Sequence, residues 1–200
     1  ITNQKLSIYK NNGNTKIYPS EVFDKIKKND FLSIGFDGLE IKIIKVTPNI
    51  LSCRVIKGGM IENNKGIHLI NRNIKLNFIT EKDKVAINIA QKMNVNYFAL
   101  SFTNTLKDIL KFNKLLKNRI KIYKIETKNA LKNINKIILA GQSFLIDRGD
   151  LSKDVSIEML PFIQRKILKI AKENDKQVYV ATNFLESMVK NKYPNRGEAN

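Results

Sequence analysis

The sequence IKIYKIE, residues 120–126, is typical of a β-strand whose carboxyl end opens into a polar site. Alternation with a period of two gives one face that carries two aliphatic side chains followed by two charged ones: Ile120, Ile122, Lys124 and Glu126. Unpaired charge in a core costs roughly several kcal/mol, so charges on an inward face are expected where a buried strand emerges. A simple Lys–Glu surface pair is the alternative for this segment alone.

Two later apolar runs end in the same manner. FLIDRGD, residues 144–150, ends with Gly149, which lets a ligand or another backbone approach closely, and with Asp150, which supplies a hard oxygen. VYVAT, residues 178–182, ends with the hydroxyl of Thr182, although a threonine here also suits a helix cap. Because the carboxyl ends of parallel strands share one rim, we expect these residues and the charged end of the first run to face one pocket.

From residue 80 onward, helix-length amphipathic stretches alternate with short apolar runs, which indicates βα units around a parallel sheet. Four runs are strand candidates, at residues 96–101, 119–125, 144–147 and 177–181. A complete eightfold barrel needs about twice that number.

Helices are expected to begin at Thr80, Thr127 and Ser156, the last with Pro161 in its first turn. Their apolar faces are expected in the core: Val85, Ile89 and Met93; Leu131, Ile134 and Ile138; Leu160, Ile163, Ile167 and Ile170.

Residues 1–72 consist of short β-rich runs separated by turn residues, which predicts an antiparallel β module. The segments at residues 39–43 and 50–55 are expected to form a hairpin. We place the boundary near Asn73, which gives domains at 1–72 and 73–200.

The 200 residues are 42% hydrophobic, enough for the core of a globular protein, and carry a formal net charge of +18. That charge favours anionic partners. Lysine is dispersed, however, and arginine, the better bidentate reader of nucleic acid, is scarce. We therefore expect phosphorylated metabolites rather than nucleic acid as partners.

The single cysteine, Cys53, excludes an internal disulfide but leaves the redox compartment open, and we take an intracellular, cytoplasmic location as the default expectation. No apolar run approaches the ~20 residues of a membrane span and no signal peptide is visible, so we expect a soluble protein that does not bind membranes. The chain starts at Ile1 without an initiator methionine and stops at Asn200 within a polar stretch, so we expect a fragment.

The predicted rim suits a divalent cation. Glu126 and Asp150 supply two carboxylates, and Mg²⁺ is usually held by one or two carboxylates together with substrate oxygens and water. Lys124 would then lie beside the ion, and the two cations would repel unless an anion lay between them. The set therefore predicts a doubly anionic substrate with phosphate, carboxylate or both, and phosphoryl transfer or enolate chemistry.

Several motifs in order resemble the pyruvate kinase family over nearly the whole chain. YKIE at 123–126 is similar to its Lys-Ile-Glu strand, IDRGDL at 146–151 to its Arg-Gly-Asp-Leu turn, and ATNFLESM at 181–188 to its Ala-Thr-Gln-Met-Leu-Glu-Ser-Met block. The earlier part matches at Phe36-Asp37-Gly38, Gly58-Gly59, Lys65-Gly66-Ile67-His68-Leu69 and Thr80-Glu81-Lys82-Asp83.

The resemblance implies an α/β fold that is part of a (β/α)₈ TIM barrel, with an inserted small all-β lid domain that closes over the nucleotide and brings Lys65 near the ATP phosphates. It implies transfer of the phosphoryl group of phosphoenolpyruvate to ADP, giving pyruvate and ATP, with Mg²⁺ and K⁺. The family's early strands, which carry an Arg for the phosphate and the K⁺ ligands, and its last strand and allosteric domain lie outside this resemblance. We therefore expect the fragment alone to be inactive and the complete protein to be a homo-oligomer, a tetramer in the family.

Carried over residue by residue, the resemblance assigns Lys124 to the migrating phosphoryl group, and Glu126 and Asp150 to the Mg²⁺ ion. Gly149 would present its backbone to the substrate. Thr182 would contact the substrate near the site of enolate protonation.

Departures from the family pattern occur at five positions: Asp147 stands where the family usually has a small apolar residue, His68 replaces an Asn, Ser152 a Gly, Gln177 a Pro and Asn183 a Gln. Asp147 adds negative charge near the expected metal. It would either alter the affinity for the ion or point away from it, and because alternation turns it away from its neighbours, we favour the second interpretation. His68 has no evident carboxylate partner beside it and receives no role.

Three other functions fit parts of the sequence. A metal-dependent barrel lyase that works through a pyruvate enolate would also use two carboxylates at strand ends, but the lid and Lys124 argue against it. An inactive homologue would not need the charged and hydroxyl residues of the rim, so the retention of these residues argues against it. A nucleic-acid-binding protein would use the net charge, but dispersed lysines without a basic aromatic patch disfavour it.

Overall fold

The computed structural model describes residues 2–35, 38–72, 74, 76–182, 185–195 and 198. The chain divides into two compact units, Ile1–Thr80 and Glu81–Asn200. Asn73, near which the sequence places the boundary, lies outside the described residues, as do the motif residues Phe36, Asp37, Asn183 and Phe184. Both units combine strands and helical segments, and the chain as a whole is α/β.

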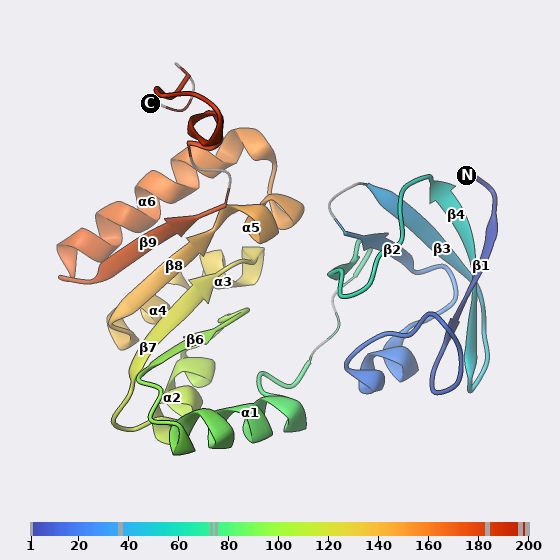
Figure 1. The fold of residues 1–200 in the computed structure, drawn as a ribbon, viewed down its shortest axis with the longest axis horizontal. Coiled ribbons are helices and arrows are strands. Elements are labelled where there is room, and N and C mark those ends of the chain that lie inside the picture. The colour runs from blue at the N-terminus through green and yellow to red at the C-terminus, as the bar shows by residue number, and fades with distance from the viewer. Residues whose placement is uncertain are drawn as a thin grey trace. The chain divides into compact units, whose positions relative to one another are not determined.

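The first unit is built on an antiparallel sheet with the strand order β1-β4-β3-β2-β5 (Figure 1). Its strands are β1 (Lys5–Tyr9), β2 (Phe31–Ile34), β3 (Leu39–Val46), β4 (Ile50–Lys57) and β5 (Ile67–Leu69), and a 3-10 helix, η1, covers Ser20–Lys25. Strands β3 and β4 form the hairpin that the sequence predicts, so that prediction is confirmed.

A core of aliphatic side chains holds this unit together. Alternate residues of β3 and β4 point inward, and Ile41, Ile43, Leu51 and Cys53 are almost completely buried. At the edge of this core, the buried carboxylate of Asp30 accepts hydrogen bonds from Arg72, at 2.8 Å from Nε and 2.6 Å from Nη2. This bidentate pair compensates the cost of burying the carboxylate.

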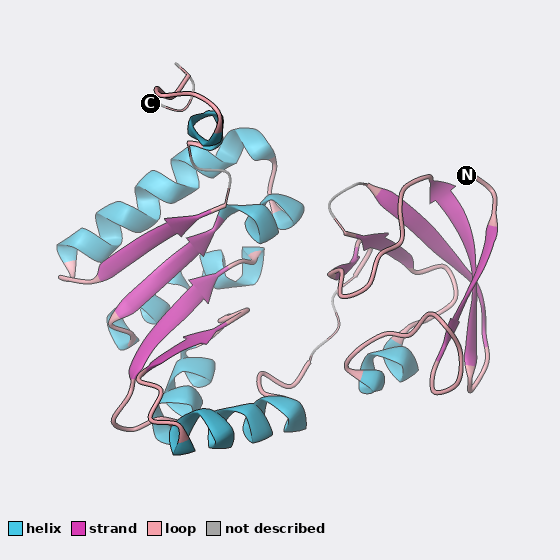
Figure 2. Ribbon diagram, in the orientation of Figure 1, coloured by secondary structure: helices cyan, strands magenta, loops and turns pink. Residues whose placement is uncertain are grey.

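The second unit is built on a parallel sheet with the order β6-β7-β8-β9, and its four arrows run in the same direction in Figure 2. The strands are β6 (Tyr97–Leu100), β7 (Ile120–Ile125), β8 (Ser143–Asp147) and β9 (Gln177–Ala181). Each lies within a residue of its predicted bounds, so the four strand predictions are confirmed.

Helical segments alternate with the strands of this second unit, and the first of them precedes β6. They are α1 (Glu81–Lys92), α2 (Leu106–Leu115), α3 (Lys128–Lys132), α4 (Ile134–Ala140), α5 (Arg148–Asp154), η2 (Ile157–Met159), α6 (Leu160–Glu173) and η3 (Glu186–Val189). Helices α2, α4 and α6 are neighbours, and α6 lies along β9. Among the described residues, none of these helices has the length and apolar character needed to cross a membrane.

The two faces of the parallel sheet differ. Tyr123 and Phe144 are fully buried, and the Tyr123 ring meets the ring of Phe112 on α2 edge to face. The other face holds Tyr97, Ile120 and Tyr179, which are 66%, 46% and 48% exposed. Along the face of β7 that begins at Ile120, exposure falls toward the carboxyl end: Lys124 is half-buried and Glu126 is 2% exposed. The prediction that this face points inward therefore stays a prediction at its Ile120 end, while Phe112 of α2 packs against the Tyr123 face.

Two helix predictions need correction. The face of α1 that carries Val85, Ile89 and Met93 was expected in the core, but each of these side chains is more than half exposed within the described residues. The single helix expected after Thr127 is divided into α3 and α4 at Asn133, whose side-chain amide donates to the backbone carbonyls of Asn104 and Asn129. Thr127 does cap α3, by accepting from the Ala130 N–H.

The third predicted helix begins differently from the expectation. Ser156 makes no capping hydrogen bond through its side chain and precedes the 3-10 turn η2. Helix α6 follows with Pro161 in its first turn, as predicted, and it buries Leu160 and Ile167.

Candidate active site

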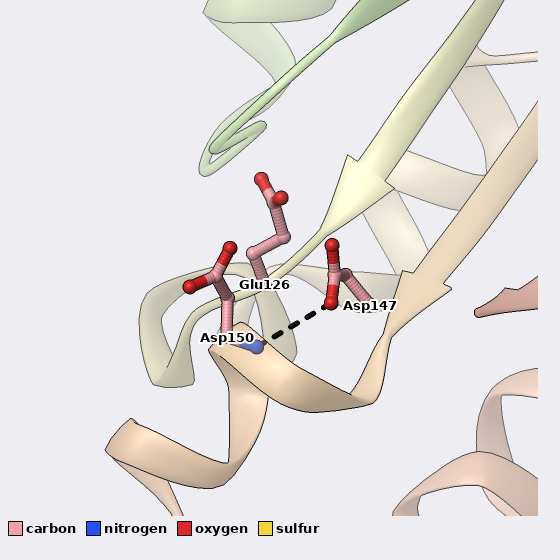
Figure 3. A group of neighbouring side chains, drawn as sticks. All are labelled: Glu126, Asp147 and Asp150. Atoms are coloured by element: carbon pink, nitrogen blue, oxygen red, sulfur yellow. Dashed lines mark hydrogen bonds between the residues drawn. The ribbon is translucent and has the colours of Figure 1, made fainter. Parts of the chain in front are cut away.

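Three strand ends carry the predicted site residues. Lys124 lies near the end of β7 and Glu126 follows it directly, Asp150 lies in the helix after β8, and Thr182 follows β9. These ends lie at one edge of the sheet because the strands are parallel and in register. Figure 3 shows the carboxylates of Glu126 and Asp150 with that of Asp147, which ends β8.

Glu126 is the most buried charged side chain of the site, with 2% of its surface exposed. Its Oε2 accepts a hydrogen bond from the backbone N–H of Phe102, which follows β6. Its Oε1 lies 2.5 Å from the Nζ of Lys124 but makes no aligned hydrogen bond with the described residues. Burial raises the pKa of Glu126, against the opposing effects of the Lys124 ammonium and the Phe102 N–H.

Lys124 lies between two carboxylates. Its Nζ is 2.5 Å from Oε1 of Glu126 and 3.1 Å from Oδ2 of Asp147. Burial alone would favour the neutral amine, but the two carboxylates outweigh burial and raise the pKa of Lys124 above its ordinary value. The side chain is therefore a fixed positive charge at neutral pH.

Asp147 belongs to the site, and the interpretation that its side chain points away is wrong. Its Oδ1 accepts hydrogen bonds from the Thr182 hydroxyl at 2.8 Å and from the Asp150 N–H at 3.4 Å. Lys124 is paired in register with Leu145, so the period of two carries Asp147 to the face that holds Lys124. Burial acts to raise the pKa of Asp147, but the bonds from Thr182 and Lys124 prevail and lower it.

Thr182 has an unusual backbone conformation. Its φ of 76° lies in the left-handed region, which β-branched residues rarely adopt. Two interactions hold it there: its hydroxyl donates to Asp147, and its carbonyl accepts from the guanidinium of Arg148 at 2.7 and 3.2 Å. Gly149 makes room for it, because a Cβ at that position would lie 2.8 Å from the Thr182 Cγ2.

The carboxylates suit a hard divalent cation. One oxygen each from Glu126, Asp147 and Asp150 lies within 4.8 Å of the others. Two oxygens bound to one Mg²⁺ at about 2.1 Å are at most about 4.2 Å apart, so small side-chain rotations would bring these groups around an ion. The buried Glu126 Oε1, which lacks an aligned donor among the described residues, also fits such an ion.

Sequence comparisons identify the family. A family profile described as pyruvate kinase, barrel domain, matches residues 2–200. This chain belongs to the pyruvate kinase family. The chain is 33% identical over 177 residues to a pyruvate kinase from Thermotoga maritima, covering 86% of this chain and 38% of that protein.

Other pyruvate kinases are similarly close. One from Clostridium perfringens is 35% identical over 193 residues, which cover 93% of this chain and 41% of the relative. One from Buchnera aphidicola subsp. Acyrthosiphon pisum is 35% identical over 199 residues, which cover 94% of this chain and 41% of the relative. The chain thus spans about two fifths of the length of these pyruvate kinases.

Two residues singled out in the other unit lie in or near β5. Lys65, the predicted nucleotide contact of this pyruvate kinase family member, has its Nζ 2.5 Å from Oε2 of Glu62. His68 is half-buried in β5 and pairs with Ser33 of β2. The contact of Lys65 with a nucleotide stays a prediction.

Sequence reasoning missed two contributors to the site, the backbone N–H of Phe102 and the guanidinium of Arg148, and it misinterpreted the direction of a third, the carboxylate of Asp147. The signal for Asp147 was present, because it is an acid at the end of a predicted strand, as Glu126 is. The sequence has no comparable signal for the Phe102 N–H, because a backbone donor is independent of residue type.

Proposed function

We propose that the complete protein is a pyruvate kinase, which transfers the phosphoryl group of phosphoenolpyruvate to ADP and forms pyruvate and ATP. One observation carries this proposal: the Lys124 ammonium and the carboxylates of Glu126 and Asp150 meet at the ends of neighbouring parallel strands. Phosphoryl transfer depends on positioning and charge neutralisation more than on covalent chemistry, and these groups supply both.

Lys124 has the central role in the proposal. Its ammonium would bind the migrating phosphoryl group as the P–O bond to enolpyruvate breaks and a P–O bond to the terminal phosphate oxygen of ADP forms. Glu126 and Asp150 would hold Mg²⁺, and the carboxylate donors fit that ion. When bound, the ion would neutralise charge on the substrate oxygens.

Thr182 and Gly149 would orient the organic part of the substrate. After transfer, the enolate of pyruvate takes a proton at its methylene carbon, and we place the Thr182 hydroxyl near that carbon. Gly149 would present its backbone to the substrate. The strained conformation of Thr182 supports a functional role, because such strain persists only where surrounding contacts impose it.

The remaining features of this proposal concern the complete molecule. We propose that residues 1–72 are a lid in which Lys65 approaches the ATP phosphates, and that residues 73–200 are the middle βα units of a TIM barrel. The K⁺ ligands would lie outside this chain. The complete protein would act in the cytoplasm as a homo-oligomer, a tetramer as in the family.

Expression of the intact gene tests this proposal. The purified product should form ATP from phosphoenolpyruvate and ADP with Mg²⁺ and K⁺ present. Lys124→Met should lower kcat at least about a hundredfold, because an electrostatic contact to the reacting group is lost. Lys169→Met, which removes an exposed lysine paired with Glu173 on α6, should leave kcat unchanged. Absence of ATP formation by the wild-type protein, or equal kcat in wild type and Lys124→Met, would reject the proposal.

A further inference from the structure

The carboxylate of Asp147 has more partners than a helix cap requires. It accepts from the Thr182 hydroxyl at 2.8 Å and from the Asp150 N–H at 3.4 Å, and it lies 3.1 Å from the Lys124 ammonium. Capping α5 needs only the bond from Asp150. The other two partners come from different strands, β7 and the end of β9.

These partners include the two side chains to which the proposed function assigns the anionic substrate. Lys124 would bind the phosphoryl group and Thr182 would contact the enolate end. An ionised carboxylate can only accept hydrogen bonds, so the Thr182 proton points at Asp147 and not at a ligand. An incoming anion therefore meets donors that already have an anionic partner.

We propose that Asp147 competes with the anionic substrate for Lys124 and Thr182 and so weakens substrate binding. The inference rests on the proposed function. Its physical basis is that a bound phosphate or carboxylate must displace the Asp147 carboxylate or lie next to it, and like charges in close contact lower affinity.

The competition has a defined direction. Removing the charge of Asp147 leaves the Lys124 ammonium with one carboxylate partner instead of two. It also removes a negative charge that would repel the bound anion. The affinity for a free anion should therefore rise. A residue that merely supported the site would have the opposite effect, because its loss would disorder Lys124 and Thr182 and weaken binding.

Asp147→Asn is the most informative variant, because asparagine keeps a side-chain oxygen able to cap α5 while removing the charge. Asp175→Asn is the matched control: it makes the same charge change at an exposed turn before β9, at the opposite end of that strand. Asparagine also tolerates the left-handed conformation of Asp175, whose φ is 53°. Asp147→Ala removes the acceptor as well as the charge.

The experiment uses the full-length protein and measures the dissociation constant of phosphoenolpyruvate by calorimetry. Mg²⁺ is kept saturating for wild type and every variant, which a repeat titration at twice the Mg²⁺ concentration verifies, so that loss of a carboxylate near the metal ligands does not alter the result through metal binding. Asp147→Asn should bind at least about tenfold more tightly than wild type, because the like-charge contact is removed. Asp175→Asn should match wild type, and thermal unfolding checks that Asp147→Asn and Asp147→Ala remain folded.

Equal or weaker binding by folded Asp147→Asn would overturn the inference, as would a gain of the same size in Asp175→Asn. If Asp147→Asn fails to fold, folded Asp147→Ala gives the same comparison. Tighter binding without ATP formation by any version would retain the competition and reject the proposed activity. ATP formation by wild type with unchanged affinity in Asp147→Asn would support the proposed activity and reject the competition.

Discussion

A chain of alternating charges runs through the site, from the Glu126 carboxylate through the Lys124 ammonium to the Asp147 carboxylate. Asp150 adds a third carboxylate, and Lys153 lies 3.0 Å from its Oδ1. The carboxylates of the group still outnumber the two ammonium groups. The local field therefore favours a cation among the carboxylates, as metal-assisted phosphoryl transfer requires, and Asp147 opposes the binding of an anion at Lys124.

Cys53 gives a test of the core of the first unit. Burial raises the pKa of this thiol from 9.0 to about 11. At pH 8 only about one thiol in a thousand would be ionised, and the thiolate is the reactive form. Iodoacetamide should therefore leave Cys53 unmodified in the folded protein at pH 8 and modify it fully in urea, as mass spectrometry can measure.

The same shift has a defined sign for stability. As pH rises, the thiol ionises first in the unfolded chain, where its pKa has the ordinary value of 9.0. The contribution of Cys53 to the free energy of unfolding is therefore complete below about pH 9 and is lost as pH rises to about 11. The free energy of unfolding should fall across this range, and by less in Cys53→Ala. Rapid modification of the native protein at pH 8 would contradict the buried position of Cys53.

At the scale of elements, helix starts depend on side-chain geometry that residue type alone does not reveal. Thr105 forms a capping box on α2: its hydroxyl accepts from the Asp108 N–H, and the Asp108 carboxylate accepts from the Thr105 N–H. Ser156 precedes η2 without any such side-chain bond. Serine and threonine are both good cap residues, so the difference lies in the chain path before each helix.

Substitution by alanine is expected to have different effects at these two helix starts. Thr105→Ala should lower the free energy of unfolding by about 1 kcal/mol, because the Asp108 N–H loses its acceptor. Ser156→Ala is the matched control and should change it little, since no capping bond is lost. Urea titrations followed by circular dichroism compare the two variants. Equal destabilisation by both would show that the two caps do not differ.

At the scale of the whole molecule, the parallel sheet buries only one of its faces within the described residues. Tyr97, Ile120 and Tyr179 remain exposed on the other face. Helix α1 likewise exposes Val85 and Ile89. Apolar surface of this kind marks an interface or promotes aggregation, and the relatives contain additional chain, since the matched segment is 38–41% of their length.

The 200-residue chain on its own is therefore expected to self-associate. Light scattering should detect aggregates that are absent from the intact gene product, because apolar side chains avoid water. In the 200-residue chain, Ile120→Lys together with Tyr179→Glu should reduce aggregation. Lys166→Glu with Lys169→Glu, two changes on α6 outside this face, is the control. A monodisperse wild-type chain would contradict the prediction.

Much of the fold was predictable because its patterns are local. The apolar runs of β6 to β9 differ clearly from the amphipathic stretches between them, and the alternation of β3 and β4 identifies a hairpin. The break at Asn133 was not predictable, because it depends on a hydrogen bond to Asn104, which is distant in sequence. The exposure of α1 was not predictable either, because an amphipathic pattern reveals a face but not its partner.

The sequence by itself determined where the strands end and which chemical groups stand there: Lys124, Glu126, Asp150 and Thr182. Only the tertiary structure decided which of these groups touch. The register between β7 and β8 places Asp147 beside Lys124, and the left-handed turn at Thr182 aims its hydroxyl at Asp147. The physical reason is that alternation along one strand assigns side chains to a face, whereas contacts between strands depend on register and backbone path, which local pattern does not encode.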